Sequence, residues 1–342
     1  MQCRQTWPAV ALMLIGTACS AADLPVEIPA EFAARDTLDI GEESNEDARQ
    51  CLQGLVWKPQ AFAVRCEAGQ SGRGDLLVRF PSPVASGDER NDSVSMEWYV
   101  ARDEQRRPIT APAVVVVHES GRGMQVGQLF ARGLRVQGLH AFLIHLPGYG
   151  ERRSPDKRSR AENIVTAIQQ AVADVRRARD AVAALPAVDS RHIALQGTSL
   201  GGFVSATAAG LDDGFDSVFI VLAGGQLYEL IQSGEREAAE IREQLAAVGI
   251  TGERLRTLAL RIEPTRLAHR LNPQRTWLFS GKYDTVVPLK NALALSEAAK
   301  LDDEHHIQMT ADHYSGIVFL PWVLPRIHGC IQQSLTADAV GE

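Results

Sequence analysis

A serine between two glycines is the first feature of this sequence that could carry out chemistry. Ser199 stands in the run Gly-Thr-Ser-Leu-Gly at 197–201, after a strand-like stretch at 191–196 and before small residues at 203–209. A strand, Gly-X-Ser-X-Gly and a helix make up a nucleophile elbow, a turn so sharp that positions two residues from the serine tolerate almost no side chain. The turn exposes the hydroxyl and aims the first helical N–H groups toward it. We therefore interpret Ser199 as a nucleophile; an ordinary Gly-Ser turn is the alternative.

A serine hydroxyl needs a base and a group that orients the base, and candidates for both follow in the sequence. Asp284 lies in a tight turn after the strand-like run 276–279, and His313 comes just after the strand-like run 306–309. Positions beyond the carboxyl ends of parallel strands share one edge of a sheet. Other histidines and aspartates are weaker candidates for these two roles, because they lie within a strand, precede Ser199 in the sequence, or are not in a turn that directly follows a strand. They are His192, His305, His306, Asp302, Asp303 and Asp312.

Strands and helices alternate along the part of the chain that must position these residues. The run 113–117 is continuously apolar, as in strands buried on both faces, and similar runs occur at 141–144 and 217–222. The long stretch 161–185 has apolar residues at helical spacing. This alternation predicts an α/β fold with a doubly wound, mostly parallel sheet.

Two further regions flank or interrupt that alternation. Extended runs separated by turns at about 55–110 predict antiparallel N-terminal strands that lead into the sheet. A charged, helical insertion at about 226–271 leaves after one strand and returns before the next. We expect it to form a small cap over the strand ends where ligands bind; an ordinary peripheral helical pair is the alternative.

At this point the chain resembles the α/β-hydrolase family, over about residues 113–335. The runs Val-Val-Val-His-Glu at 115–119 and Leu-Pro-Gly-Tyr-Gly at 146–150 are most similar to dienelactone-hydrolase-like and bacterial acetyl-esterase-like enzymes. The resemblance implies the α/β-hydrolase fold, with Ser199 as nucleophile, His313 as general base and then acid, and Asp284 as the group that orients the imidazole.

Acyl transfer also needs hydrogen-bond donors for the developing oxyanion. The residue after the nucleophile, Leu200, is expected to supply one backbone N–H. The second donor should come from the loop after the strand at 113–117, where many relatives carry His-Gly-Gly and this chain has Glu119 and Ser120 instead. We favour the Ser120 N–H, with that of Glu119 as the alternative. For the Glu119 carboxylate we favour a role at a helix start over a role in specificity.

The N-terminus predicts export. A short positive start, an apolar core at 7–18 and small residues up to Ala22 are typical of a signal peptide at 1–22. Cleavage before Cys19 would leave a lipid-anchored lipoprotein, whereas cleavage after Ala22 would release a soluble protein; both remain open. We interpret 23–50 as an acidic tether and 51–342 as a single domain. In an oxidising compartment Cys51 and Cys66 are our candidate disulfide, and Cys330 is expected to be a buried thiol.

Composition narrows the classes of partner and cofactor. The 342 residues carry a net charge of −7 and no basic stripe with aromatic residues, which argues against nucleic-acid binding. There is no C-x-x-C, H-E-x-x-H or phosphate loop, so we expect no cofactor and no metal. The basic loop at 151–160 is more typical of a solvated loop than of a rim that selects anionic substrates.

The sequence thus predicts an exported serine hydrolase, periplasmic or extracellular, that cleaves carboxylic esters through an acyl-enzyme. Its substrate would be a small-molecule or polysaccharide ester, and membrane association would come only through Cys19. One alternative is a serine peptidase of the prolyl-oligopeptidase type. Such peptidases carry a large propeller before the hydrolase domain, and we expect the chain before Ala113 to be too short for one. The others are a thioesterase, an acyltransferase, or a non-catalytic binding protein. Acyl and alcohol specificity and oligomeric state stay open.

Overall fold

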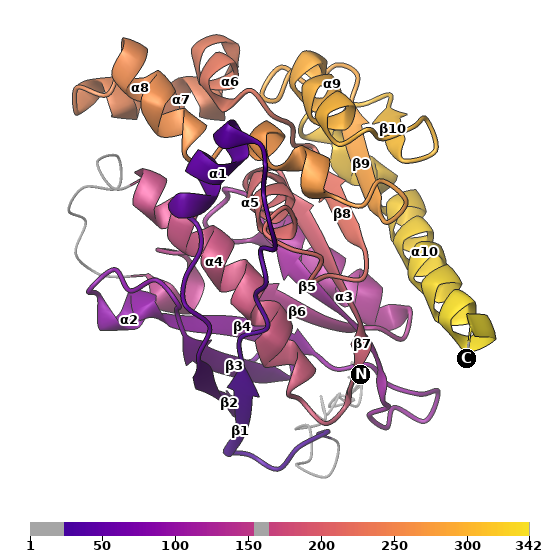
Figure 1. Cartoon of the computed structure of the whole chain (residues 1–342). Coiled ribbons are helices and arrows are strands. Elements are labelled where there is room, and N and C mark those ends of the chain that lie inside the picture. Colours follow the sequence, from indigo (N-terminus) through magenta and orange to yellow (C-terminus); the bar gives the residue numbers. More distant parts are fainter. Residues whose placement is uncertain (1–23, 154–163, 342) are drawn as a thin grey trace, which may run out of the picture.

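The apolar runs form the middle of one twisted sheet in the computed structural model, which describes residues 24–153 and 164–341 (Figure 1). Ten strands in these residues are ordered β1-β2-β3-β4-β6-β5-β7-β8-β9-β10. The six strands β6, β5, β7, β8, β9 and β10 pair parallel with one another in the sheet. The strands β1 to β4 pair antiparallel with one another, and β4 pairs antiparallel with β6. Their bounds are β1 Ala30–Arg35, β2 Ala61–Ala68, β3 Leu76–Pro81, β4 Ser93–Tyr99, β5 Ala111–Val117, β6 His140–Ile144, β7 Val188–Thr198, β8 Val218–Val221, β9 Thr276–Gly281 and β10 His306–Met309. The predicted mostly parallel sheet with an antiparallel lead-in is confirmed.

Helices cover both faces of the sheet, as the continuous apolar strands require. Alternate residues of β5 enter two different hydrophobic clusters: Val115 packs on one face and Val114 on the other. The helices on the first face are α4 (Ile164–Ala183), α5 (Leu200–Ala209) and α9 (Leu289–Ala298), and those on the second are α3 (Gln125–Val136) and α10 (Leu320–Gly341). The doubly wound arrangement is therefore confirmed. Within the described residues, none of these helices is long and apolar enough to cross a membrane.

The insertion at 226–271 contains three helices that lie together at the top of Figure 1. They are α6 (Leu227–Ser233), α7 (Glu237–Ala247) and α8 (Gly252–Leu260). A small cluster of their own, with Leu245, Ile250 and Leu255 buried, holds them together. The carboxylate of Glu263 accepts the N–H groups at the start of α6, at 2.8 and 2.6 Å. The insertion is thus a compact unit fixed at its return to the sheet.

The N-terminal segment differs from the predicted tether. Residues 30–35 form β1 at the sheet edge, and α1 (Glu46–Gln53) follows. The chain between them passes over the helical layer of α4 and α5, in indigo in Figure 1. Its carboxylates have partners: Asp36 is buried against Arg177, and Glu43 pairs with Arg270. The acidic composition therefore reflects ion pairs with the folded body rather than a solvated arm.

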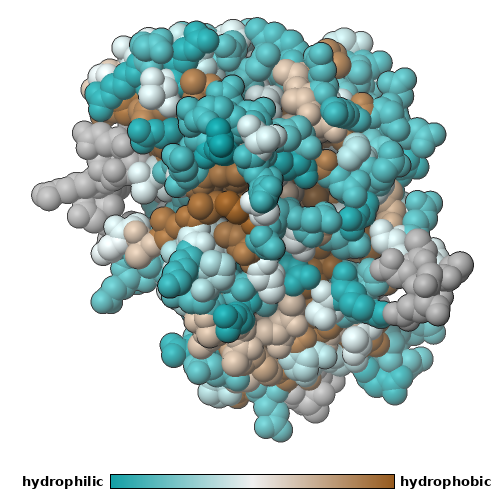
Figure 2. Space-filling model, viewed as in Figure 1, coloured by the Kyte–Doolittle hydropathy of each residue, from teal (hydrophilic) through white to brown (hydrophobic). Residues whose placement is uncertain are grey.

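The surface seen in Figure 2 is mostly hydrophilic over α1 and the three inserted helices, and an area of hydrophobic side chains shows below α1. The predicted signal peptide at 1–22, with Cys19, lies outside the described residues. So does most of the basic loop at 151–160, from residue 154 onward.

The predicted disulfide is wrong. Cys51, Cys66 and Cys330 are all free, buried thiols, so only the expectation for Cys330 holds. Cys51 lies in α1 and donates its S–H to the carbonyl of Arg261, whereas Cys66 lies within β2. Burial raises the pKa of Cys51 to about 11 and that of Cys66 to about 12. The two cysteines are close in sequence, but each packs into the apolar core as a small hydrophobic residue.

Candidate active site

The serine sits on a strained turn between β7 and α5. Ser199 has φ 52° and ψ −116°, a conformation that residues with a side chain rarely adopt. A Cβ on Gly197 would meet the carbonyl oxygen of Gly201 at 2.2 Å, and a Cβ on Gly201 would meet that of Val117 at 2.2 Å. Only glycine fits at both positions, which is the steric reason for the Gly-X-Ser-X-Gly spacing. The turn leaves Ser199 partly exposed at the carboxyl edge of the sheet.

Ser199, His313 and Asp284 come together at this edge in a chain of hydrogen bonds. The Ser199 Oγ lies 2.9 Å from Nε2 of His313, and Nδ1 of His313 lies 2.7 Å from Oδ2 of Asp284. The side chain of Asp284 is 1% exposed and that of His313 is 11% exposed, so water has little access to their contact. This order and these distances match a hydroxyl that can give its proton to an imidazole, with a carboxylate that orients the imidazole.

The loops after β9 and β10 are tied to each other, which explains why two distant residues meet. The N–H of Tyr283 donates to the carbonyl of Ala311 at 3.0 Å. The second carboxylate oxygen of Asp284, Oδ1, accepts the N–H groups of Val286 and Val287 at 2.9 and 2.8 Å. Asp284 is thus held by the turn that follows its strand, with Oδ2 left to face His313.

The competing residues lie elsewhere. Asp302 pairs with His305 at the start of β10, and Asp312 accepts the N–H groups of Tyr314 and Ser315 within its own turn. These backbone hydrogen bonds, led by the one from Ser315, lower the pKa of Asp312. His192 lies within β7, and Asp216 is its neighbour at 3.9 Å. The hydrogen-bond partners of the Ser199 hydroxyl and of the His313 ring in the described structure are each other and Asp284.

The loop after β5 lies beside the serine turn, as an oxyanion site would require. The close approach of Gly201 to the carbonyls of Val117 and His118 brings the start of this loop against the first turn of α5. Leu200 is the first residue of α5, so its N–H has no acceptor inside the helix. Ser120 is exposed in the loop. Both proposed donors therefore belong to segments that meet at Ser199.

Glu119 serves the start of α3. Its carboxylate oxygens accept the N–H groups of Val126 and Gly127 at 3.2 and 3.1 Å. These hydrogen bonds satisfy donors that a helix leaves free at its first turn. The favoured interpretation of Glu119 as a helix-entry carboxylate is confirmed.

The inserted helices contact the loop that carries His313. The Tyr314 hydroxyl donates to the carboxylate of Glu237 at the start of α7, with oxygen distances of 2.5 and 2.6 Å. The guanidinium of Arg236 lies 4.7 Å from the centre of the Tyr314 ring. Burial and the Glu237 carboxylate raise the pKa of Tyr314. The insertion thus contacts the loop that carries His313, and a cap over the strand ends stays a prediction.

Sequence reasoning did not assign a role to three residues at this edge: His118, Tyr149 and Tyr314. His118 and Tyr149 belong to runs quoted only for their family resemblance, and their rings pack against each other at a tilt of 58°, with centres 4.6 Å apart. The signal that could have drawn attention to them is their position in the loops that follow two adjacent parallel strands, β5 and β6.

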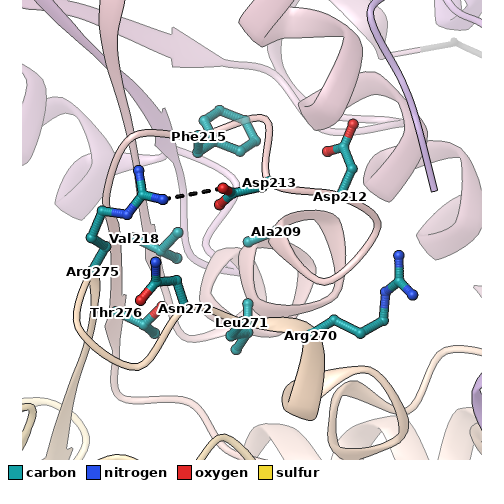
Figure 3. Close-up of a pocket in the computed structure, with 10 residues that line it drawn as sticks. All are labelled: Ala209, Asp212, Asp213, Phe215, Val218, Arg270, Leu271, Asn272, Arg275 and Thr276. Atoms are coloured by element: carbon teal, nitrogen blue, oxygen red, sulfur yellow. Dashed lines mark hydrogen bonds and ion pairs between the residues drawn. The ribbon is translucent and has the colours of Figure 1, made fainter. Parts of the chain in front are cut away.

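A separate pocket lies at the far end of α5 (Figure 3). Ala209, Val218 and Thr276 line it, and Arg275 pairs with Asp213 beside them. Ala209 ends α5, whose ten residues span about 15 Å from its start at Leu200. This pocket is therefore not part of the candidate active site. The described residues also contain no group of three or more His, Cys, Asp or Glu arranged to hold a metal ion.

Comparison with known proteins agrees with the geometry. The chain superposes on an acetyl xylan esterase from Paenibacillus sp. R4 with a TM-score of 0.60, at 15% identity over 85% of this chain and 96% of that one. The chain has the α/β-hydrolase fold. The fold predicted from the sequence is confirmed.

Two other solved structures show the same fold. Acetyl xylan esterase 1 from Thermoanaerobacterium sp. JW/SL YS485 has a TM-score of 0.51 and 13% identity, over 81% of this chain and 90% of that chain. A puromycin-hydrolysing peptidase of Mycobacterium tuberculosis has a TM-score of 0.56 and 16% identity, over 80% of this chain and 46% of that chain.

Sequence comparisons are sparser. The model of the prolyl oligopeptidase family matches residues 166–316 of this chain, a range that includes Ser199, Asp284 and His313. A direct search against curated proteins finds no match.

Proposed function

We propose that this α/β hydrolase is a serine esterase that cleaves carboxylic esters through an acyl-enzyme. The observation that carries the proposal is the hydrogen-bonded chain from Ser199 through His313 to Asp284, at 2.9 and 2.7 Å. Esterase chemistry is favoured because the acetyl xylan esterases superpose over most of the chain. The substrate is a small-molecule ester or an esterified polysaccharide.

In the first step the Ser199 oxygen attacks the ester carbonyl carbon while Nε2 of His313 takes its proton. The negative charge that develops on the carbonyl oxygen is stabilised by the N–H groups of Leu200 and Ser120. Asp284 keeps the Nδ1 proton in place and stabilises the imidazolium. His313 then protonates the alcohol oxygen as it leaves, and an ester bond joins the acyl group to Ser199.

The second step repeats this chemistry with water. Nε2 of His313 takes a proton from a water molecule, whose oxygen attacks the acyl carbon. The same two N–H groups stabilise the charge on the carbonyl oxygen. His313 returns the proton to the Ser199 oxygen, which releases the carboxylic acid and restores the enzyme. Both steps use only groups of this chain and water.

Labelling with a fluorophosphonate probe tests the nucleophile. The wild-type protein should be labelled and Ser199→Ala should not. Ser205→Ala is a matched control, because Ser205 is a buried serine of the same helix whose hydroxyl has no hydrogen-bond partner in the described structure. Equal labelling of wild type and Ser199→Ala would place the nucleophile elsewhere.

A panel of substrates tests the reaction. Nitrophenyl esters of rising acyl length, run beside an acetylated polysaccharide, should show turnover that is lost in Ser199→Ala. Labelled protein that hydrolyses none of these esters would contradict the esterase proposal.

A serine peptidase is the second candidate, and the match to the prolyl oligopeptidase family model favours it. Peptide nitroanilides with proline or other residues at the cleaved bond would distinguish the two. Hydrolysis of these amides with kcat/KM above that of the esters would favour the peptidase. Labelling without turnover of either class would favour a thioesterase or an acyltransferase. No labelling and no turnover would favour a binding protein.

We further propose that the protein is exported, on the signal-like composition of residues 1–22. N-terminal sequencing of protein from the native host distinguishes the outcomes. A terminus after Ala22 would indicate a soluble protein, and a lipid-modified Cys19 would indicate an anchored one. Cytoplasmic protein that retains its first residues would refute export.

A further inference from the structure

Three successive carbonyl oxygens in the loop after β5, those of residues 119–121, each accept a hydrogen bond. In the same order, the donors are His118 Nδ1 at 2.6 Å, the Tyr149 hydroxyl at 3.0 Å and Met124 N at 3.0 Å. A trans peptide is planar, so the C=O of one residue and the N–H of the next point in opposite directions. A group that holds the carbonyl of Glu119 therefore also sets the direction of the Ser120 N–H.

The imidazole of His118 is locked in one tautomer. The backbone N–H of Leu146 donates to Nε2 at 3.2 Å, so Nε2 carries no proton. Nδ1 therefore holds the proton and donates it to the carbonyl of Glu119. Burial lowers the pKa of His118 to about 3, so the ring stays neutral near pH 7. The first of the three hydrogen bonds is thus present whenever the protein is folded.

Tyr149 holds the next peptide from a different loop. It lies in the loop after β6, and its ring packs against that of His118, tilted by 58° with centres 4.6 Å apart. From there its hydroxyl reaches the carbonyl of Ser120. The two peptides that flank the Cα of Ser120 are thus each held by a side chain, although Ser120 itself is exposed. His118 holds the peptide that contains the Ser120 N–H, and Tyr149 holds the peptide that follows it. Without them, an exposed loop peptide has freedom to rotate.

We propose that His118 and Tyr149 are positioning residues for the Ser120 N–H. His118 sets its direction toward the carbonyl oxygen of an ester attacked by Ser199, and Tyr149 keeps the following peptide from rotating, so that this direction is maintained. The proposal rests on the proposed function. In this role neither side chain needs to touch the substrate. An oxyanion donor matters most when charge develops on the oxygen, so a misdirected N–H weakens the transition state more than the bound substrate. The expected effect is on kcat and not on KM.

Tyr149→Phe tests the hydroxyl alone, because the phenylalanine ring can still pack against His118. We expect kcat to fall by about 10- to 100-fold, less than the roughly 10²–10³-fold of a deleted donor, with KM unchanged. A boronic acid forms a tetrahedral adduct with the serine, so its affinity should fall by a similar factor. Tyr228→Phe, which removes a hydroxyl from α6 outside both loops, should match wild type.

His118 provides a second, independent pair of variants. In His118→Asn the amide NH2 can take the place of Nδ1–H and still donate to the Glu119 carbonyl, whereas His118→Leu has no donor. The asparagine variant should therefore keep more of its kcat than the leucine variant when both show wild-type circular dichroism. Equal losses in the two folded variants would overturn the role assigned to Nδ1.

The rate of fluorophosphonate labelling separates this proposal from the esterase proposal, because the phosphonyl oxygen also needs the oxyanion donors and no ester is involved. Slower labelling of Tyr149→Phe supports the positioning role even when the natural substrate is not an ester. Wild-type rates of labelling, turnover and boronate binding in Tyr149→Phe would overturn it. Failure of the wild type to hydrolyse any ester, with labelling intact, would overturn only the esterase proposal.

Discussion

Replacing Asp284 with asparagine removes one negative charge at nearly constant shape. Oδ1 of Asp284 accepts the N–H groups of Val286 and Val287, and Oδ2 accepts the Nδ1–H of His313. In Asp284→Asn the amide oxygen should stay with the two backbone donors. Turning the amide round would leave two buried N–H groups without an acceptor, at roughly 1–3 kcal/mol each. The amide NH2 therefore faces Nδ1 of His313.

The consequence is the wrong tautomer of the histidine. A donor that faces Nδ1 keeps the ring proton on Nε2, and an imidazole protonated there cannot accept the proton of Ser199. Loss of this control lowers kcat by about 10⁴-fold in serine hydrolases. At 1.36 kcal/mol for each factor of ten, this is roughly 5 kcal/mol of activation free energy. KM should change little, because Asp284 lies buried behind His313.

The assay is kcat and KM for a nitrophenyl acetate, with thermal unfolding as a check of the fold. Asp312→Asn is the matched control, because its carboxylate lies one residue from His313, is exposed, and accepts only hydrogen bonds that an asparagine oxygen can also accept. We expect it to stay within about threefold of wild type. A folded Asp284→Asn protein whose kcat falls by less than about tenfold would refute the role of Asp284.

Two further predictions concern buried groups. Because burial raises the pKa of Cys51 to about 11 and that of Cys66 to about 12, a thiol reagent at neutral pH should react with them only after the protein is denatured. The denatured protein should react without a reductant. If a reductant were needed, the two cysteines would form a disulfide after all. Burial also lowers the pKa of His118 to about 3 and that of His140 to about 4. Below about pH 6.5 the unfolded chain therefore binds protons that the folded chain does not, and the free energy of unfolding should fall by about 1.4 kcal/mol per pH unit for each ring. The measurement is urea unfolding from about pH 7 to about pH 5, a range above that in which the carboxylates with lowered pKa protonate. A free energy of unfolding that does not change over this range would contradict the prediction.

Local patterns predicted most of the parallel sheet because continuous apolar runs such as 113–117 have no other stable location than between two layers. The same reasoning failed for β1, whose sequence Ala-Glu-Phe-Ala-Ala-Arg is half exposed at an edge and has no strong alternation. It also missed α1, although Asn45 caps that helix and Ala48 and Leu52 are spaced to bury one face. An acidic run resembles a solvated arm until its basic partners, far away in sequence, are known.

The arrangement of the site was only partly readable. Gly197 and Gly201 allowed the serine turn to be predicted. In such a turn the backbone comes too close to these two positions for a side chain to fit. The pairing of Asp284 with His313 followed from their positions after strands. The hydrogen bond from Tyr149 to Ser120 had no local signal, since it joins two loops whose distance depends on the packing of β5 beside β6.

By itself the sequence determined the residue types, their order and the strands they follow, because steric limits on a turn and the burial of apolar runs act over a few neighbouring positions. Tertiary structure decided which cysteines stay apart, where the acidic N-terminal segment binds, and which side chains hold the loop at Ser120. Those outcomes depend on distances between segments far apart in the chain, and such distances exist only after the sheet and its two helical layers have packed.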